Sequence, residues 1–410
     1  MSAGAWLACA AAAAEDWPIF NGPRQDGTSA ETGLALDWPE AGPPVVWRKR
    51  LGPSFSPPVV AKGRLIAFHR VNSDEIVECV DALAAKRLWE FHYPTRYKDQ
   101  YQYNGGPRSS PAIDGDRVYT YGAEGVLTCL DLATGRKVWQ RPLNQELEAP
   151  QEFFGVGTPP VIEGDVILLN PGAPGGAGVV GIDKRTGKTL WTTSEHGASY
   201  SAPVVRTVRG RRMAVFFTKD GLLVVAPESG KVLYEYPLRS LQFESVNAAS
   251  PVVVGDVAFL SASYNVGAVA MRLGADGLDI VWQDKAAMQN HWATSIHHEG
   301  HLYGVHGRHE REAEVRCLQW ATGKVQWASP RGELGRLTGI LAQGRLIAMA
   351  ERGQLVVIEA NPERYVLRRR TPMLDGPCYA PPVLANGLLY IRNETVLLCC
   401  DVRGETEVTK

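Results

Sequence analysis

Three segments decide the fold: Ser110-Pro-Ala-Ile-Asp-Gly-Asp-Arg-Val-Tyr119, Gly125-Val-Leu-Thr-Cys-Leu-Asp131 and Thr134-Gly-Arg-Lys-Val-Trp139. They follow one another closely, and the same order returns later in the chain. The clear copies are Thr158 to Trp191, Ser201 to Tyr234, Ser250 to Trp282 and Thr294 to Trp327, and weaker copies begin near Ser56, Thr338 and Ala380. Pro58 and Pro382 lie 324 positions apart, which is seven periods of about 46 residues and is typical of propeller blades.

Each repeat predicts four short strands. An apolar segment after Ser-Pro or Thr-Pro forms the first strand, and a Gly-Asp or Asn-Gly turn leads to the second. The third ends in an acidic residue before a Thr-Gly or Ser-Gly turn, and the fourth ends in Trp or Tyr. The acidic residues are Asp81, Asp131, Asp183, Glu228, Glu359 and Asp401. A carboxylate at that place accepts backbone N–H bonds from the turn, so we expect a structural role.

The last repeat ends at about Asp401 to Glu405, before a fourth strand can form. The segment Pro44 to Arg50 contains the missing tryptophan, Trp47, and has no repeat of its own. We therefore expect the N-terminal strand to complete the last blade and to satisfy its open edge. The prediction is an all-β chain, an eight-bladed β-propeller of four-stranded antiparallel blades.

The pattern Asp-x-x-Thr-Gly-Lys-x-x-Trp resembles the tryptophan-docking repeat of pyrroloquinoline-quinone-type propellers, and Asp131 to Trp139 and Asp183 to Trp191 match it best. The leader segments Asp16 to Pro23 and Leu36 to Pro43 resemble secreted bacterial members of this superfamily that are known only as quinone-binding-like repeat proteins. That superfamily holds both quinone dehydrogenases and non-catalytic scaffolds, so the resemblance implies a fold and leaves the function open.

The ends of the chain and its composition suggest an exported protein. Residues 1–14 resemble a signal peptide that lacks a basic start, residues 15–44 form an extension, 45–405 the propeller and 406–410 a tail. The net charge is -1 and no charge run stands out, which argues against a nucleic-acid partner. No stretch is long enough to span a membrane. We expect a periplasmic or extracellular monomer.

Four of the seven cysteines occupy one position of the repeat, namely Cys79, Cys129, Cys317 and Cys399. The equivalent residues elsewhere are Gly181, Ala226, Ala270 and Val357, so the position favours a small buried side chain over a disulfide. The pair Cys399-Cys400 has a second interpretation, because quinone-dependent alcohol dehydrogenases carry a vicinal disulfide. Its place in a predicted strand instead favours side chains on opposite faces.

Six of the nine histidines fall between His291 and His309, which raises the possibility of a metal site. The repeat divides them: His297, His298 and His301 flank the first turn of a blade, and His291, His306 and His309 lie at its other end. Neither group has tight ligand spacing, so we expect structural or surface roles and no metal site.

Two sets of residues carry the functional and structural expectations. Trp47, Trp89, Trp139, Trp191, Trp282 and Trp327 are expected to pack between blades as a girdle. The residues before the first strands should converge on the channel mouth, as a candidate site for an anionic, aromatic or carbohydrate ligand or as a plug. They are Arg108, Ser109, Tyr200, Asn247, His291, Trp292, Arg336 and Tyr379. The insertions 100–106 and 172–178 should decorate the rim.

The preferred function is a non-catalytic binding or scaffold module, with a protein partner at the rim or a blade edge or a small ligand at the mouth. Quinone dehydrogenases use an Asp base and a calcium site on long insertions. Here the blades are nearly bare and no such Asp-containing loop matches. We expect no catalytic residue and no cofactor, and the alternative is a quinone-dependent oxidoreductase with calcium or a degenerate descendant of one.

Overall fold

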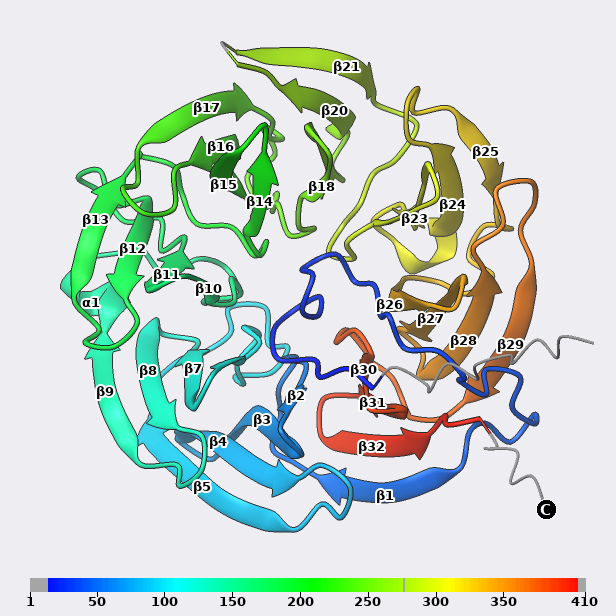
Figure 1. Cartoon of the computed structure of the whole chain (residues 1–410), viewed down its shortest axis with the longest axis horizontal. Helices are drawn as coiled ribbons and strands as arrows, with labels where there is room; N and C mark the ends of the chain where they lie inside the picture. Colours follow the sequence, from blue (N-terminus) through cyan, green and yellow to red (C-terminus); the bar gives the residue numbers. More distant parts are fainter. Residues whose placement is uncertain (1–13, 276, 405–410) are drawn as a thin grey trace, which may run out of the picture.

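The computed structural model describes residues 14–275 and 277–404, and these form eight four-stranded sheets arranged radially in a ring (Figure 1). Blade 1 is β2 (Val59–Ala61), β3 (Arg64–Val71), β4 (Asp74–Asp81) and β5 (Arg87–Pro94). Blade 2 is β6 (Ala112–Asp114), β7 (Arg117–Tyr121), β8 (Val126–Asp131) and β9 (Lys137–Pro142). Blade 3 is β10 (Val161–Glu163), β11 (Val166–Leu169), β12 (Val179–Asp183) and β13 (Thr189–Thr193). Blade 4 is β14 (Val204–Val208), β15 (Arg211–Phe217), β16 (Gly221–Val225) and β17 (Val232–Pro237).

The second half of the ring repeats this arrangement. Blade 5 is β18 (Val252–Val254), β19 (Val257–Ala262), β20 (Gly267–Leu273) and β21 (Leu278–Asp284). Blade 6 is β22 (Ile296–His298), β23 (His301–His306), β24 (Glu314–Gln319) and β25 (Val325–Ala328). Blade 7 is β26 (Leu337–Ala342), β27 (Arg345–Ala350), β28 (Gln354–Glu359) and β29 (Leu367–Pro372). Blade 8 is β30 (Val383–Ala385), β31 (Leu388–Arg392), β32 (Val396–Asp401) and β1 (Val45–Arg50). Two short helical turns, α1 (Leu143–Glu146) and η1 (Glu310–Glu312), lie in the connections.

The closure predicted from the sequence is confirmed. β1 pairs antiparallel with β32 as the outermost strand of blade 8, and Trp47 lies opposite Cys399. This strand from the opposite end of the chain covers the outer edge of β32 and gives blade 8 the same four strands as the other blades.

The tryptophans of the outer strands join neighbouring blades. Each indole Nε1 donates to a backbone carbonyl of the next blade, and the Tyr234 hydroxyl does the same in blade 4. The acceptors are Ala82 for Trp47, Leu132 for Trp89, Lys184 for Trp139, Pro227 for Trp191, Trp320 for Trp282, Asn361 for Trp327 and Gly274 for Tyr234. The bonds measure 2.5 to 3.1 Å, so each large ring is fixed both by packing and by a directed bond.

The acidic turn residues have the local role expected of them in blades 1, 2 and 3. Asp131 Oδ1 accepts from the backbone N–H and the hydroxyl of Thr134, at 3.0 and 2.8 Å. In blade 4 the expected register is wrong by two residues. Val224 lies opposite Tyr234, and Ala226, which we expected in the small-residue position, takes the place of the acidic residue. Glu228 therefore lies inside the turn, because this blade has no carboxylate at the strand end.

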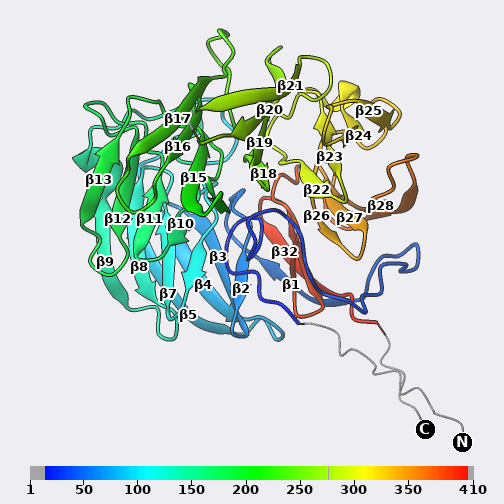
Figure 2. The same cartoon turned by 45° about the horizontal axis from the view of Figure 1, so that its top comes forward.

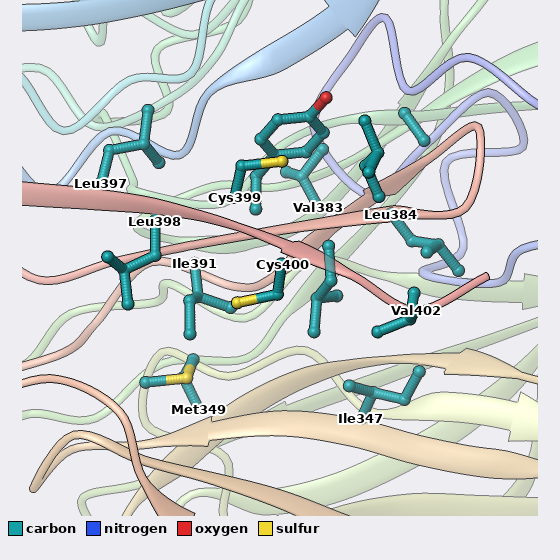
Figure 3. Packing of buried hydrophobic residues seen from close by; sticks show 14 of the residues in the cluster. Ile347, Met349, Val383, Leu384, Ile391, Leu397, Leu398, Cys399, Cys400 and Val402 are labelled. Atoms are coloured by element: carbon teal, nitrogen blue, oxygen red, sulfur yellow. The ribbon is translucent and has the colours of Figure 1, made fainter. Parts of the chain in front are cut away.

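The cysteines of the described chain are buried and unpaired. Cys79, Cys129, Cys317 and Cys399 each lie opposite the tryptophan of their own blade. Cys399 and Cys400 point to opposite sides of β32, with Cys400 directed toward Met349 (Figure 3). The strand interpretation of this pair is thus confirmed. Cys9 lies outside the described residues, as does most of the expected signal peptide.

The extension before β1 crosses one end of the channel (Figure 1, Figure 2). Trp17 bridges to Val60 of blade 1, Thr28 bridges to Leu341 of blade 7, and Leu34 bridges to Arg403 beyond β32. The carboxylate of Glu31 accepts from the N–H groups of Asn386 and Gly387 at 2.7 and 2.6 Å. The segment is therefore an integral part of the domain, because it satisfies polar groups at the inner ends of several blades.

Candidate functional site

The central channel contains a cavity of about 230 Å³. The extension closes one end of it with Phe20, Asn21, Asp26 and Gly27. At the other end, side chains from the connections between blades form the mouth. Since one end is covered by the chain itself, the mouth is where a ligand would reach this cavity.

Six of the eight residues expected at the mouth line this cavity. They are Arg108, Tyr200, His291, Trp292, Arg336 and Tyr379. The other two, Ser109 and Asn247, are buried and are not among its lining residues. The Asn247 side-chain amide donates to the carbonyls of Thr218 and Leu238, at 2.8 and 3.1 Å. That amide fixes the connection before blade 5, so the side chain is turned away from the channel.

Arg108 is held by Asp99 of its own loop and by aromatic rings of two other connections. Its Nη2 donates to Asp99 at 2.6 Å, and its guanidinium lies 5.3 Å from the ring centre of Phe55 and 5.6 Å from that of Phe154. Asp99 is nearly fully buried. A buried carboxylate beside a guanidinium neutralises it, so this charge is already paired.

Arg336 has an equivalent partner on another loop. Its Nε donates to Glu351 Oε2 at 2.8 Å, its Nη2 donates to Oε1, and the Tyr379 hydroxyl donates to the same carboxylate at 2.9 Å. The guanidinium lies 4.5 Å from the ring centre of Trp292. The mouth therefore carries two neutralised arginines stacked on aromatic rings, and an anion, one of the ligands expected there, loses its main support.

His291 is neutral at physiological pH. Burial, together with the nearby Arg336 and Arg308, lowers the pKa of His291 to about 3. Its Nε2 lies 3.1 Å from the Tyr264 hydroxyl. Arg308, which the sequence did not single out, lies 4.4 Å above the Tyr264 ring and forms no ion pair with any described residue.

An exposed apolar ridge borders the mouth. It comprises the exposed Tyr101, Tyr103, Leu241 and Phe243 and the half-buried Phe153 and Phe154, which come from the loops after blades 1, 2 and 4. Leu241 and Phe243 are 96% and 85% exposed, and Phe243 packs on Phe153 with ring centres 5.6 Å apart. Phe154 continues the ridge into the mouth, 5.7 Å from Tyr200. The insertion 100–106 pointed to the first of these loops, whereas nothing in the repeat pattern marked 238–248.

The residues around the mouth do not fit a calcium-bound quinone. Such a group needs free oxygen ligands at the site. The carboxylates of Asp99 and Glu351 are held by arginines, and the carboxylate of Asp26 lies at the far end of the cavity. Within residues 14–275 and 277–404, no group of three His, Cys, Asp or Glu side chains is arranged to hold a metal ion. The histidine cluster is divided as expected, and His297 packs on Trp320.

A family model described as outer membrane protein assembly factor BamB matches residues 73–329 and 311–402. The curated relatives include a protein of that name from Burkholderia pseudomallei, 32% identical over 40% of this chain and 39% of its own length. A second protein of that name, from Yersinia pestis, is 22% identical over 68% of this chain and 70% of its own length. The quinohemoprotein alcohol dehydrogenase ADH IIB of Pseudomonas putida is 31% identical, over 28% of this chain and 17% of the enzyme. The match thus spans well under half of two of these relatives.

Solved structures show the same fold. BamB from Moraxella catarrhalis superposes with a TM-score of 0.63 at 14% identity, over 88% of this chain and 98% of that one. The quinohemoprotein alcohol dehydrogenase of Comamonas testosteroni superposes with a TM-score of 0.50 at 14% identity, over 96% of this chain and 82% of the enzyme. The expected pyrroloquinoline-quinone-type propeller is thereby confirmed, while the fold alone is common to both functional classes.

Proposed function

Because the chain belongs to the family described as outer membrane protein assembly factor BamB, we propose that it is a non-catalytic binding module that acts with another protein in assembling outer membrane proteins. The exported location expected from the sequence is part of this proposal. In the described part of the chain, no helix combines the length and apolarity needed to cross a membrane.

The observation that carries the proposal is the apolar ridge beside the mouth. Large, contiguous and exposed apolar side chains mark interaction sites on soluble proteins. Aromatic side chains are also enriched in the centres of protein interfaces, because they bury much area at small entropic cost. Here Leu241 and Phe243 are almost fully exposed to solvent, while Tyr101 is fixed by its hydroxyl bond to Glu244 at 3.1 Å. We assign the ridge to a protein partner of the outer membrane assembly process.

The test uses a strain that lacks the gene and is complemented with variants. The double change Leu241→Asp and Phe243→Asp should lower the amount of heat-modifiable, folded outer membrane β-barrel proteins toward the level of the deletion strain. A photo-reactive residue at position 243 should cross-link to one assembly component, identified by mass spectrometry.

The matched control places the same charges on exposed apolar side chains of the outer strands, as Val138→Asp and Leu190→Asp, which are 41% and 49% exposed in the native chain. These variants should complement fully. Full complementation by the ridge variant, at equal protein level, would show that the ridge plays no part in the function.

A small ligand in the channel is the second candidate. The cavity of about 230 Å³ and its aromatic walls favour it, and the paired state of Arg108 and Arg336 favours a neutral aromatic compound over an anion. Thermal-shift measurements with a panel of such compounds test it, and the double change Arg108→Ala and Arg336→Ala should abolish any shift. The same measurement with pyrroloquinoline quinone and calcium tests the oxidoreductase alternative, and we expect no thermal shift with them.

A further inference from the structure

The turn 122–125 between β7 and β8 holds two loops of the ridge. The Ala123 carbonyl accepts from Val156 N–H at 3.0 Å, which anchors the loop that carries Phe153 and Phe154. The Glu124 carboxylate accepts from the Thr95 hydroxyl at 2.6 Å and from Arg96 N–H at 2.7 Å. These two bonds anchor loop 95–108, which carries Tyr101 and Tyr103. The turn is thus the shared support of the ridge.

A buried carboxyl group lies directly against this turn. Glu75, on β4, is 1% exposed, and its Oε1 accepts from Ala123 N–H at 2.8 Å. A Cβ atom at Gly122 would lie 2.0 Å from Glu75 Oε2 and 2.5 Å from the Tyr93 hydroxyl oxygen. The carboxyl and the phenol therefore occupy room that only a glycine leaves open. Glu75 lines neither the cavity nor the ridge, and its carboxyl is shielded from solvent.

Two charged groups face Glu75, and both hold loop 95–108. Glu124 is the like charge, on the turn itself. Arg70, on β3, is the opposite charge, and its Nη1 donates to the carbonyls of Tyr97 and Gly105 at 2.6 and 3.0 Å. Among the described residues Arg70 has no carboxylate partner, and its guanidinium instead holds the loop through these bonds to backbone carbonyls. An ionised Glu75 would repel the first anchor and compete for the second.

We propose that Glu75 is a protonation-controlled latch, which holds loop 95–108 in place when its carboxyl is neutral and loosens the loop when it is ionised. As the loop opens, the proton leaves Glu75 Oε2 to solvent and the hydrogen bonds that anchor the loop loosen, while no other covalent bond is made or broken. The consequence for a protein partner at the ridge rests on the proposed function, whereas the latch itself is a property of the isolated chain.

The burial of Glu75 determines how the opening of loop 95–108 changes with pH. Burial and the nearby Glu124 raise the pKa of Glu75 from its ordinary 4.5 to about 7 in the closed state. In an open state the carboxyl is solvated and titrates near its ordinary value. Opening therefore becomes easier as the pH rises from about 4.5 to about 7 and no easier above that. The opening constant should grow on the order of a hundredfold over this interval.

Amide hydrogen exchange read by mass spectrometry measures this opening, after correction for the intrinsic pH dependence of exchange. In the full chain, peptides covering 95–108 should lose protection from pH 5 to pH 7 and then level off. Peptides covering 285–292, from the corresponding connection after blade 5, serve as the internal reference and should show no such change. Glu75→Gln should keep loop 95–108 protected at every pH.

Two further variants make the result specific. Tyr93→Phe keeps the ring but removes the hydroxyl that stabilises the ionised form, so the levelling-off should move to higher pH. Glu78→Gln removes another buried carboxylate of β4, which pairs with Lys49, and should leave the response intact. Unchanged protection of the loop in the native chain, or the same loss in Glu75→Gln, overturns the latch. Full complementation by the ridge variant, with the exchange result intact, contradicts the proposed function alone.

Discussion

Two interfaces between blades are filled by different parts of the chain. One lies between blades 2 and 3, and the other lies between blades 7 and 8. In the first, Trp139 donates to Lys184 at 3.1 Å, and Gly187 of blade 3 lies against the indole face, where a Cβ would be 2.8 Å from the ring. In the second, the register position of the tryptophan is taken by Arg369, which lies opposite Val357. Its Nε donates to the carbonyl of Trp38, at 2.7 Å, in the N-terminal extension.

The extension supplies the missing apolar filling. Leu36 and Trp38 are 1% and 4% exposed and belong to the same buried cluster as Val357 and Val402. Ala35 N–H donates to the Val402 carbonyl at 2.8 Å, which places the segment between the two blades. The comparison teaches that the space between neighbouring blades must be filled by large apolar side chains. Those side chains can come from the repeat itself or from a distant part of the chain.

The largest expected effect comes from a repeat tryptophan. Trp89→Ala should lower the free energy of unfolding by about 3 to 5 kcal/mol, because a buried ring and its bond to Leu132 are both lost. Chemical denaturation followed by far-UV circular dichroism measures the change. A loss below about 1 kcal/mol would show that the interface is held by other contacts.

The second test asks whether the extension is equivalent to a repeat tryptophan. Trp38→Ala should cost about 3 kcal/mol in the same denaturation experiment, because its ring is as buried as that of Trp89. If Trp38→Ala proves neutral while Trp89→Ala does not, the extension only covers the ring and does not complete it.

A smaller effect is expected at the glycine beneath the indole. Gly187→Ala should cost about 2 kcal/mol, because φ is +73° and the new Cβ meets Trp139. Gly164→Ala is the control, since φ is +58° there but nothing lies within 4 Å of the Cβ. That change should cost only about 1 kcal/mol. Equal losses at both positions would attribute the effect to the backbone alone.

The smallest effect separates the two kinds of interface most sharply. The indole nitrogen of Trp38 is buried without a partner, whereas that of Trp89 donates to Leu132 at 2.9 Å. Both changes remove the same ring volume, but only Trp89→Phe also removes a hydrogen bond, so Trp89→Phe should cost about 1 kcal/mol more than Trp38→Phe. The reverse order would mean that hydrogen bonding plays no part in docking.

The fold was predictable because its repeats are local. Strand order, period and closure by β1 follow from turns and tryptophans that recur along the chain. The wrong register in blade 4 has a physical cause: Glu228 resembled the missing acidic residue, while the bulge after Val224 fixed the true pairing. The insertion of Trp38 between blades 7 and 8 was not predictable, because the extension carries no repeat and its partners lie at the other end of the chain.

The position of the mouth was predictable from the sequence, but its charge and its exposed apolar border were not. Convergence of the connections brought six of the eight expected residues to the cavity, since it depends on the repeat alone. The charges were misjudged because Asp99 and Glu351, which neutralise Arg108 and Arg336, lie on connections without a repeat signal. The exposure of Leu241 and Phe243 was missed for a similar reason, as single apolar residues in a loop carry no pattern.

The pairing of β1 with β32 also constrains the order of folding. β1 precedes the other strands of the ring in sequence and finds its partner only when the strands of all eight blades are present, so blade 8 is completed by a long-range search. Until then both strands present unpaired edges, which is the state most exposed to aggregation. Any product that stops before Val396 leaves β1 without a neighbour. Ring closure thus requires that all eight blades be present.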